Sequence, residues 1–264
     1  MPVDPAELPP LGELPAFAER FERAGYAAGF AVERYGEIEG CPLIALTKRS
    51  RGVRPRIYLS SGIHGDEPAP PLALLSLLES GLLDDRATWF VVPLLNPSGL
   101  RRGLRENADG LDLNRDYKDL QSPEIRAHVR WLGRQPNFTV MLAVHEDWES
   151  TGYYLYELNP TGRRSLAEPM IGAVAPICPI DHSPLIDGRE SKAGILRPVA
   201  DPLLREKWPE SIYLRAHHTT LTYTIESPSA FPLPQRIAAH RRAIETAIGL
   251  TVEEFRAPRQ AAMP

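Results

Sequence analysis

The residues most able to do chemistry follow apolar stretches of the sequence. His64 and Glu67 lie three positions apart in "HGDE", directly after the apolar segment "RIYLSSGI", and His145 follows the apolar run "VMLAV". Two imidazoles and one carboxylate, with one coordination position left open, are the protein ligands of a catalytic zinc ion. We therefore interpret His64, Glu67 and His145 as candidate ligands of one Zn²⁺ per chain.

Glu226 follows a further strand-like segment, "TTLTYTI". Zinc in such a site lowers the pKa of a water to about 7 and polarises a carbonyl. A further group must take the proton of that water and pass it to a leaving nitrogen, and Glu226 is the candidate. The His-x-x-Glu spacing is by itself a weak signal, because a histidine in a turn is more often structural or solvated. We interpret Asp66, inside this motif, as a turn residue.

The stretch "LLNPSGLRRGLRENADGLDLNRDY" is polar and rich in glycine, asparagine and arginine. One interpretation is a solvated basic loop, which fits most arginine-rich loops. The other is a loop at the strand ends that supplies forked cations for a substrate carboxylate and a developing oxyanion. Its arginines are Arg101, Arg102, Arg105 and Arg115.

Hydrophobic periodicity and turn signals predict alternating strands and helices along the chain. The predicted strands are 30–36, 41–49, 56–62, 88–96, 137–145, 152–158 and 219–227. The predicted helices are 14–30, 68–81, 122–135, 163–174 and 232–255, and 178–210 is predicted as a long loop. This alternation predicts one α/β domain over 1–264, with a mostly parallel sheet covered by helices on both faces. Open sheets of this kind bind ligands beyond the carboxyl ends of their strands, so the polar residues there should share one crevice. His128 and His240, on predicted helices, are expected to be solvent-exposed.

The composition is that of an ordinary globular protein. With 43% hydrophobic residues and a formal net charge of −4, the chain has no basic field that would attract nucleic acid or an anionic membrane. The 2 cysteines exclude a disulfide framework. The first residues, acidic and rich in proline, do not resemble a secretory signal, and no run is long enough to span a membrane. We expect a cytoplasmic protein; the sequence does not indicate its oligomeric state.

Four blocks in this order resemble the signatures of the zinc metallocarboxypeptidase family, the carboxypeptidase A-like fold: "GIHGDE", "NPSG" with "LRENADGLDLNR", "AVH" and "YTIES". The resemblance implies a three-layer α/β/α sandwich with a mixed sheet of about eight strands. It also implies that His64, Glu67 and His145 are the zinc ligands and that Glu226 is the general base and acid.

The same resemblance assigns roles to the polar loop. Asp112 would accept a hydrogen bond that orients His64, and Arg105 would stabilise the oxyanion. Asn114 and Arg115 would bind the terminal carboxylate of a small peptide substrate.

The chain also departs from the family pattern. "NPSG" replaces the usual Asn-Pro-Asp-Gly, and Glu146-Asp147-Trp148 follow the second histidine. Tyr213 is the first candidate for the family's substrate-binding tyrosine, and Tyr223 the second. In length and in the "HGDE" block the chain is more similar to bacterial murein-peptide amidases than to digestive carboxypeptidases.

Three functions remain open on the sequence. The first is a metallopeptidase that hydrolyses a peptide-like amide next to a free carboxylate. The second is an N-acyl amino acid deacylase of the succinylglutamate desuccinylase or aspartoacylase type, which shares the ligand pattern and the "DLNR" block. The third is a non-catalytic protein that binds a peptide or a sugar, although such a protein would not need all of the catalytic positions.

Overall fold

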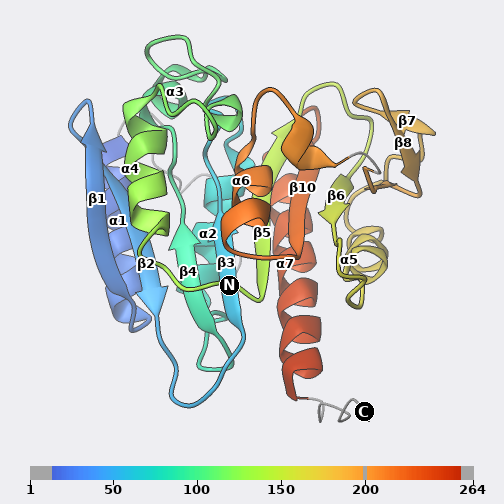
Figure 1. Cartoon of the computed structure of the whole chain (residues 1–264), viewed down its shortest axis with the longest axis horizontal. Helices are drawn as coiled ribbons and strands as arrows, with labels where there is room; N and C mark the ends of the chain where they lie inside the picture. The colour runs from blue at the N-terminus through green and yellow to red at the C-terminus, as the bar shows by residue number, and fades with distance from the viewer. Residues whose placement is uncertain (1–13, 199–200, 257–264) are drawn as a thin grey trace.

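The computed structural model describes residues 14–198 and 201–256 (Figure 1). The strands in these residues are β1 (Ala31–Ile38), β2 (Cys41–Lys48), β3 (Arg56–Ser60), β4 (Thr88–Val92), β5 (Val140–Asp147), β6 (Tyr154–Leu158), β7 (Leu185–Ile186), β8 (Arg189–Lys192), β9 (Ile195–Leu196) and β10 (Thr222–Pro228). The α-helices are α1 (Leu14–Ala27), α2 (Ala69–Glu79), α3 (Pro97–Arg102), α4 (Pro123–Leu132), α5 (Ala167–Val174), α6 (Glu210–His217) and α7 (Leu233–Arg256), and the short 3₁₀ helices include η3 (Leu113–Arg115) and η4 (Pro202–Leu204).

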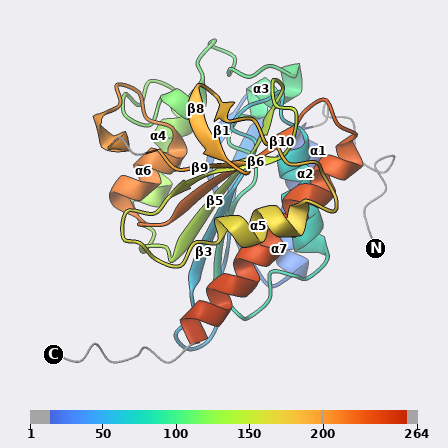
Figure 2. The same cartoon turned by 90° about the vertical axis from the view of Figure 1, so that its right-hand side faces the viewer.

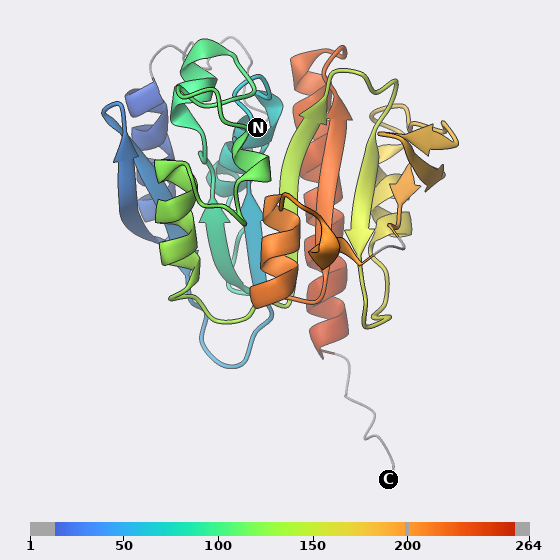
Figure 3. The same cartoon turned by 45° about the horizontal axis from the view of Figure 1, so that its top comes forward.

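The strands form one mixed sheet in the order β1-β2-β4-β3-β5-β10-β6-β9-β8-β7. The four central strands β4, β3, β5 and β10 are parallel, whereas antiparallel pairs occur toward both edges. In Figure 3, β5 and β10 run side by side in one direction and β6 runs in the opposite direction. The predicted α/β architecture with a mixed sheet is confirmed, and outside the four central strands β6 and β9 also pair in parallel.

Helices cover both faces of the sheet (Figure 2). Side chains alternate between two cores because successive residues of a strand point to opposite faces. In β3, Ile57 and Leu59 pack in the core shared with α1, α2, α5 and α7, whereas Tyr58 packs with α4 and α6. Helix α2, which packs against β5 and beside α7, is apolar nearly all round and buries every residue from Ala69 to Leu78.

The sheet has ten strands in the described residues, not about eight. The additional strands β7, β8 and β9 lie within 178–210, which was predicted as a loop. They are two to four residues long, so periodicity cannot distinguish them from irregular structure. Asp187 and Gly188, with φ values of 49° and 65°, form the connection of a two-residue hairpin. An Asp-Gly pair between two short runs is a known hairpin signal and could have revealed this one.

The prediction that His128 and His240 are solvent-exposed is wrong, since both have 0% exposure. His128 lies between the hydroxyls of Tyr58 and Tyr117, at 3.0 and 2.7 Å from its two ring nitrogens. Burial lowers the pKa of His128 and of His240 to about 3, so both rings are neutral near pH 7. The residue type alone does not determine which face of a helix it occupies, and here both histidines face the core.

Within the described residues, no helix is long and apolar enough to cross a membrane.

Candidate metal centre and active site

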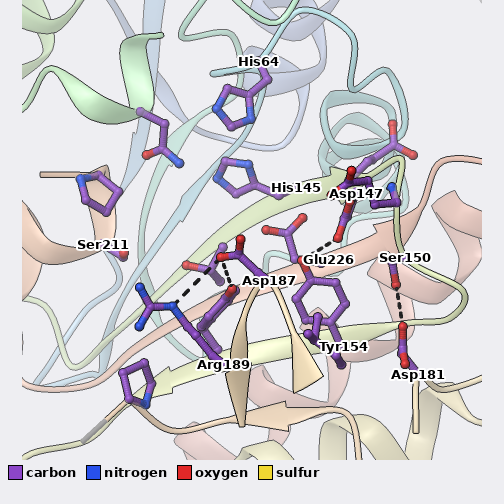
Figure 4. Close-up of a pocket in the computed structure, with 18 of the residues that line it drawn as sticks. His64, His145, Asp147, Ser150, Tyr154, Asp181, Asp187, Arg189, Ser211 and Glu226 are labelled. Carbon is purple, nitrogen blue, oxygen red and sulfur yellow. Dashed lines mark hydrogen bonds and ion pairs between the residues drawn. The ribbon is translucent and has the colours of Figure 1, made fainter. Parts of the chain in front are cut away.

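The candidate metal-binding and catalytic residues lie at the carboxyl ends of three neighbouring parallel strands. Glu226 in β10 pairs in register with His145 in β5, and β5 pairs with β3, after which the chain turns to His64. Figure 4 shows His64, His145 and Glu226 side by side in the pocket. The predicted crevice at the strand ends is therefore present, because parallel strands bring their carboxyl ends to one edge.

His64, Glu67 and His145 form a compact set of metal-binding side chains. Each offers one ligand atom, and these atoms all lie within 4.8 Å of one another. His64 Nδ1 is 2.5 Å from Glu67 Oε1, and His145 Nδ1 is 3.1 Å from Glu67 Oε2. All three residues are buried. Two nitrogens and a carboxylate oxygen converging on one point fit a divalent metal of the zinc type.

The charges around His64, Glu67 and His145 favour a cation at the point where these three side chains converge. Burial opposes the charge of Glu67, but His64 and His145 outweigh it and hold the pKa of Glu67 below its usual range. Burial lowers the pKa of His64, yet Glu67 and Asp112 raise it to about 9. The carboxylates thus stabilise a cation at this point, and a divalent ion can supply that charge.

Asp112 links the metal group to the polar loop. Its Oδ1 lies 3.3 Å from His64 Nε2 and accepts the backbone N–H of Asn114 at 2.9 Å. Its Oδ2 accepts from Arg105 Nε at 3.1 Å. Because Asp112 contacts the ring nitrogen opposite to the one facing Glu67, it can fix the orientation and tautomer of His64. The structure places Asp112 beside His64, and its predicted orienting role stays a prediction.

Arg105, Asn114 and Arg115 all line the same pocket. The guanidinium Nη1 of Arg105 is 3.3 Å from His64 Nδ1, so Arg105 lies next to the metal group. Asn114 is on η3, and its Oδ1 accepts the N–H of Glu210 at the start of α6. Arg115 donates to the carbonyl of Asn114 at 2.8 Å. The structure brings these residues together, and their roles toward a substrate stay predictions.

Glu226 is 9% exposed and faces the pocket beside the metal group. Burial raises the pKa of its carboxyl well above the usual range, the His145 ring opposes this, and Glu67 adds to it. A carboxyl group with a raised pKa can both take and return a proton near neutral pH. The structure places Glu226 beside the metal group, and its role as general base and acid stays a prediction.

Two glycines hold the "HGDE" turn against the "NPSG" segment. A Cβ atom on Gly65 would lie 1.9 Å from the carbonyl carbon of Gly99, so the two backbones touch. Asn96 caps α3 by accepting from Gly99 N at 2.8 Å, and its Nδ2 donates to the carbonyls of Ile63 and Arg105. These contacts fix the turn that carries His64 and Glu67 relative to the loop that carries Arg105.

Gly65→Ala is expected to lower the free energy of unfolding by about 1–3 kcal/mol or more, because backbone atoms must move to admit the methyl group. The measurement is urea unfolding followed by circular dichroism. The matched control is Gly172→Ala in α5, where an added Cβ meets no atom within 4 Å. The control should be neutral or slightly stabilising, and an equally small effect at both positions would contradict the close approach.

The pocket has a volume of about 630 Å³, and its far wall comes from the segment that was predicted as a loop. Asp187 at the β7–β8 turn accepts from the Tyr156 hydroxyl at 2.7 Å and lies 4.0 Å from Arg189 (Figure 4). Asp181 accepts from the Ser150 hydroxyl at 3.2 Å. We did not predict these wall residues, because their positions depend on how β7–β9 pack against β6.

The tyrosines in the pocket are Tyr154 and Tyr156. Tyr154 donates to Asp147 Oδ2 at 2.9 Å, next to Glu226 (Figure 4). The candidates from the sequence lie elsewhere: Tyr213 packs against Tyr117 and His217, and the buried Tyr223 donates to Glu157. Neither Tyr213 nor Tyr223 lines this pocket, and the identity of a substrate-binding tyrosine stays a prediction. A strand-end "YYLY" next to a polar run was the signal in the sequence.

The fold is shared with solved structures of metallocarboxypeptidases. A metallo-carboxypeptidase structure from Burkholderia cenocepacia aligns with 90% of this chain and 68% of that one, at a TM-score of 0.69 and 20% identity. A Shewanella denitrificans OS217 protein provisionally assigned as a metallopeptidase aligns with 92% of each chain, at a TM-score of 0.80 and 22% identity. At these identities the alignments show a shared fold.

Sequence relatives agree with this class. Murein peptide amidase A of Escherichia coli K12 is 34% identical over 113 residues, which are 42% of this chain and 45% of that protein. Carboxypeptidase SOL1 of Arabidopsis thaliana is 30% identical over 112 residues, 34% of this chain and 23% of that protein. A family model described as the succinylglutamate desuccinylase/aspartoacylase catalytic domain matches residues 53–155. The match spans less than half the length of these curated relatives. The predicted resemblance to zinc metallocarboxypeptidases is confirmed.

Proposed function

We propose that this protein is a zinc-dependent hydrolase that cleaves a peptide-like amide next to a free carboxylate. The observation that carries this proposal is the convergence of His64, Glu67 and His145 within 4.8 Å, beside the buried Glu226, on a pocket of about 630 Å³. A pocket of this size can enclose a short peptide or an N-acyl amino acid.

His64, Glu67 and His145 would hold the metal. When bound, zinc lowers the pKa of a water and polarises the carbonyl that the water attacks. Zinc suits two imidazoles and a carboxylate, and the burial of all three ligands favours a tightly held ion.

Glu226 would take the proton of the attacking water and deliver it to the leaving nitrogen. Burial raises the pKa of Glu226 above its ordinary value, which supports its use in returning the proton to the leaving nitrogen. Arg105 would donate hydrogen bonds to the oxygen that becomes negative as the carbonyl is attacked. Its contact with Asp112 holds the guanidinium in place for this purpose.

Asn114 and Arg115 would bind the free carboxylate of the substrate. Arg115→Ala is expected to raise KM by about 10- to 100-fold for substrates with that carboxylate, since a hydrogen bond to a charged group contributes about 1.5–3 kcal/mol. Amidated substrates should be little affected, and steady-state kinetics on matched pairs measure the difference. The control is Arg101→Ala, which removes a surface arginine paired with Glu39. An equal rise of KM for both kinds of substrate would mean that Arg115 does not bind the carboxylate.

The second candidate is an N-acyl amino acid deacylase, and the family match over 53–155 favours it. The amidase and carboxypeptidase relatives favour the peptidase, and they match chain segments of similar length. Both reactions use the same metal group and the same free carboxylate, so the distinction lies in the acyl side of the bond.

The test combines metal content with a substrate panel. Elemental mass spectrometry of the purified protein should find about one zinc per chain, as three protein ligands and one open position imply. The protein is then incubated with carboxylate-terminated peptides, murein-type peptides and N-succinyl or N-acetyl amino acids, and the products are measured by mass spectrometry. Cleavage of the N-acyl amino acids with peptides intact would favour the deacylase. A protein that neither carries nor takes up metal and cleaves no substrate would refute the hydrolase proposal and favour a binding protein.

A further inference from the structure

We propose that Glu146 is a positioning residue that holds the segments of Glu67, His145 and Glu226 in one arrangement. This inference rests on the proposed metal-dependent hydrolase. Glu146 is one of the residues by which this chain departs from the carboxypeptidase pattern.

The Glu146 carboxylate hydrogen-bonds to two chain segments that carry site residues. Its Oε2 accepts the backbone N–H of Ala69 at 2.9 Å, two residues after Glu67. Its Oε1 accepts the hydroxyl of Ser227 at 3.3 Å, and Ser227 directly follows Glu226. Because Glu146 is itself the residue after His145, a single side chain connects three of the four positions where metal binding and proton transfer are proposed.

The sheet geometry explains why Glu146 can support the site from the opposite face of the sheet. His145 and Glu226 are register partners on β5 and β10, and Glu146 and Ser227 are the next pair. Successive residues of a strand point to opposite faces, so Glu146 and Ser227 lie on the face that α2 and α7 cover. Glu146 there meets the first residue of α2, and Arg236 of α7 donates to its Oε1.

Burial excludes a role for Glu146 as a rim charge. Its side chain is 0% exposed and that of Arg236 is 12% exposed. A buried carboxylate persists only when it is paired and hydrogen-bonded, which this one is on both oxygens. These hydrogen bonds therefore hold Glu146 in one position, and through Ala69 and Ser227 they can hold the neighbouring site residues Glu67 and Glu226 in place.

The test is the isosteric change Glu146→Gln. Glutamine keeps the volume but offers one acceptor oxygen, so its NH₂ group must face either the Ala69 N–H or the Ser227 and Arg236 donors. The matched control is Glu157→Gln on β6, a second buried carboxylate with an arginine partner, Arg197, and a tyrosine donor, Tyr223. Both variants lose an ion pair, but only Glu146 hydrogen-bonds beside the metal group.

Three measurements separate positioning from general stability: zinc affinity by chelator competition, urea unfolding of the metal-free protein, and kcat with KM. We expect both variants to lose stability, and Glu146→Gln alone to bind zinc about 10- to 100-fold more weakly, as for loss of a group that supports a metal ligand. Its kcat should fall with little change in KM. Wild-type zinc affinity in Glu146→Gln, or equal losses of affinity in both variants, would overturn the inference.

Two milder variants keep the inference testable if Glu146→Gln does not fold. Ser227→Ala removes one donor and leaves the ion pair, so kcat should fall while zinc affinity is retained; an unchanged kcat would overturn the link to Glu226. Arg236→Lys keeps the charge but changes the geometry, so zinc affinity should weaken, and an unchanged affinity would overturn the link to the metal group.

A wild-type protein without zinc binding or amide cleavage would instead refute the proposed function itself.

Discussion

Replacing Glu226 with glutamine is expected to leave zinc bound and to lower kcat by about 10²- to 10⁴-fold, the usual contribution of a general acid–base group. Glutamine has nearly the same size but cannot take a proton. The three proposed ligands are untouched, so the metal content should stay that of the wild type. Elemental mass spectrometry and steady-state kinetics on the same preparation measure both quantities.

The control for this variant is Glu190→Gln on β8, an exposed carboxylate outside the pocket lining. It should retain wild-type metal content and kcat. If Glu226→Gln kept most of the wild-type kcat, Glu226 would not be the general base. Loss of metal in Glu226→Gln would instead mean that its carboxylate takes part in metal binding.

Replacing His145 with alanine is expected to remove both zinc and activity. Only two of the three proposed ligands remain, so zinc affinity should fall by more than the roughly 10- to 100-fold that follows loss of a group that merely supports a ligand. Zinc that binds only the folded state stabilises it by mass action. Adding a chelator should therefore lower the Tm of the wild type and leave the Tm of His145→Ala unchanged.

His182→Ala is the control, because His182 is exposed and lies outside the pocket lining. Its zinc content and its Tm response to the chelator should match those of the wild type. A His145→Ala protein that keeps one zinc per chain would show that the metal is held elsewhere.

Much of the central architecture is predictable from local signals. The segments of β3, β5 and β10 are continuous apolar or alternating runs that end in His64, His145 and Glu226. Since parallel strands end at one edge of a sheet, the sequence predicted that these residues meet. The structure brings them together, and their catalytic roles remain to be tested by the variants above.

The far wall of the pocket could not be predicted in the same way. Strands β7–β9 are too short to carry a periodic pattern. Asp187 and Arg189 reach the pocket only because their hairpin, β7–β8, joins the sheet through β9, the strand that pairs with β6. Tyr154 and Tyr156 of β6 also line the pocket, whereas Tyr213 and Tyr223 do not. This wall of the pocket therefore consists of residues whose positions are set by tertiary packing.

The sequence by itself determined the α/β class, the main strands and the residues able to bind a metal, because apolar periodicity and ligand chemistry are properties of short segments. Only the tertiary structure decided that Glu146 lies behind the site and is 0% exposed at its side chain, and that His128 and His240 lie in the core. Burial of a polar side chain depends on partners distant in sequence, such as Arg236 for Glu146 and Tyr58 for His128. Those partners come together only when the helices pack against the sheet.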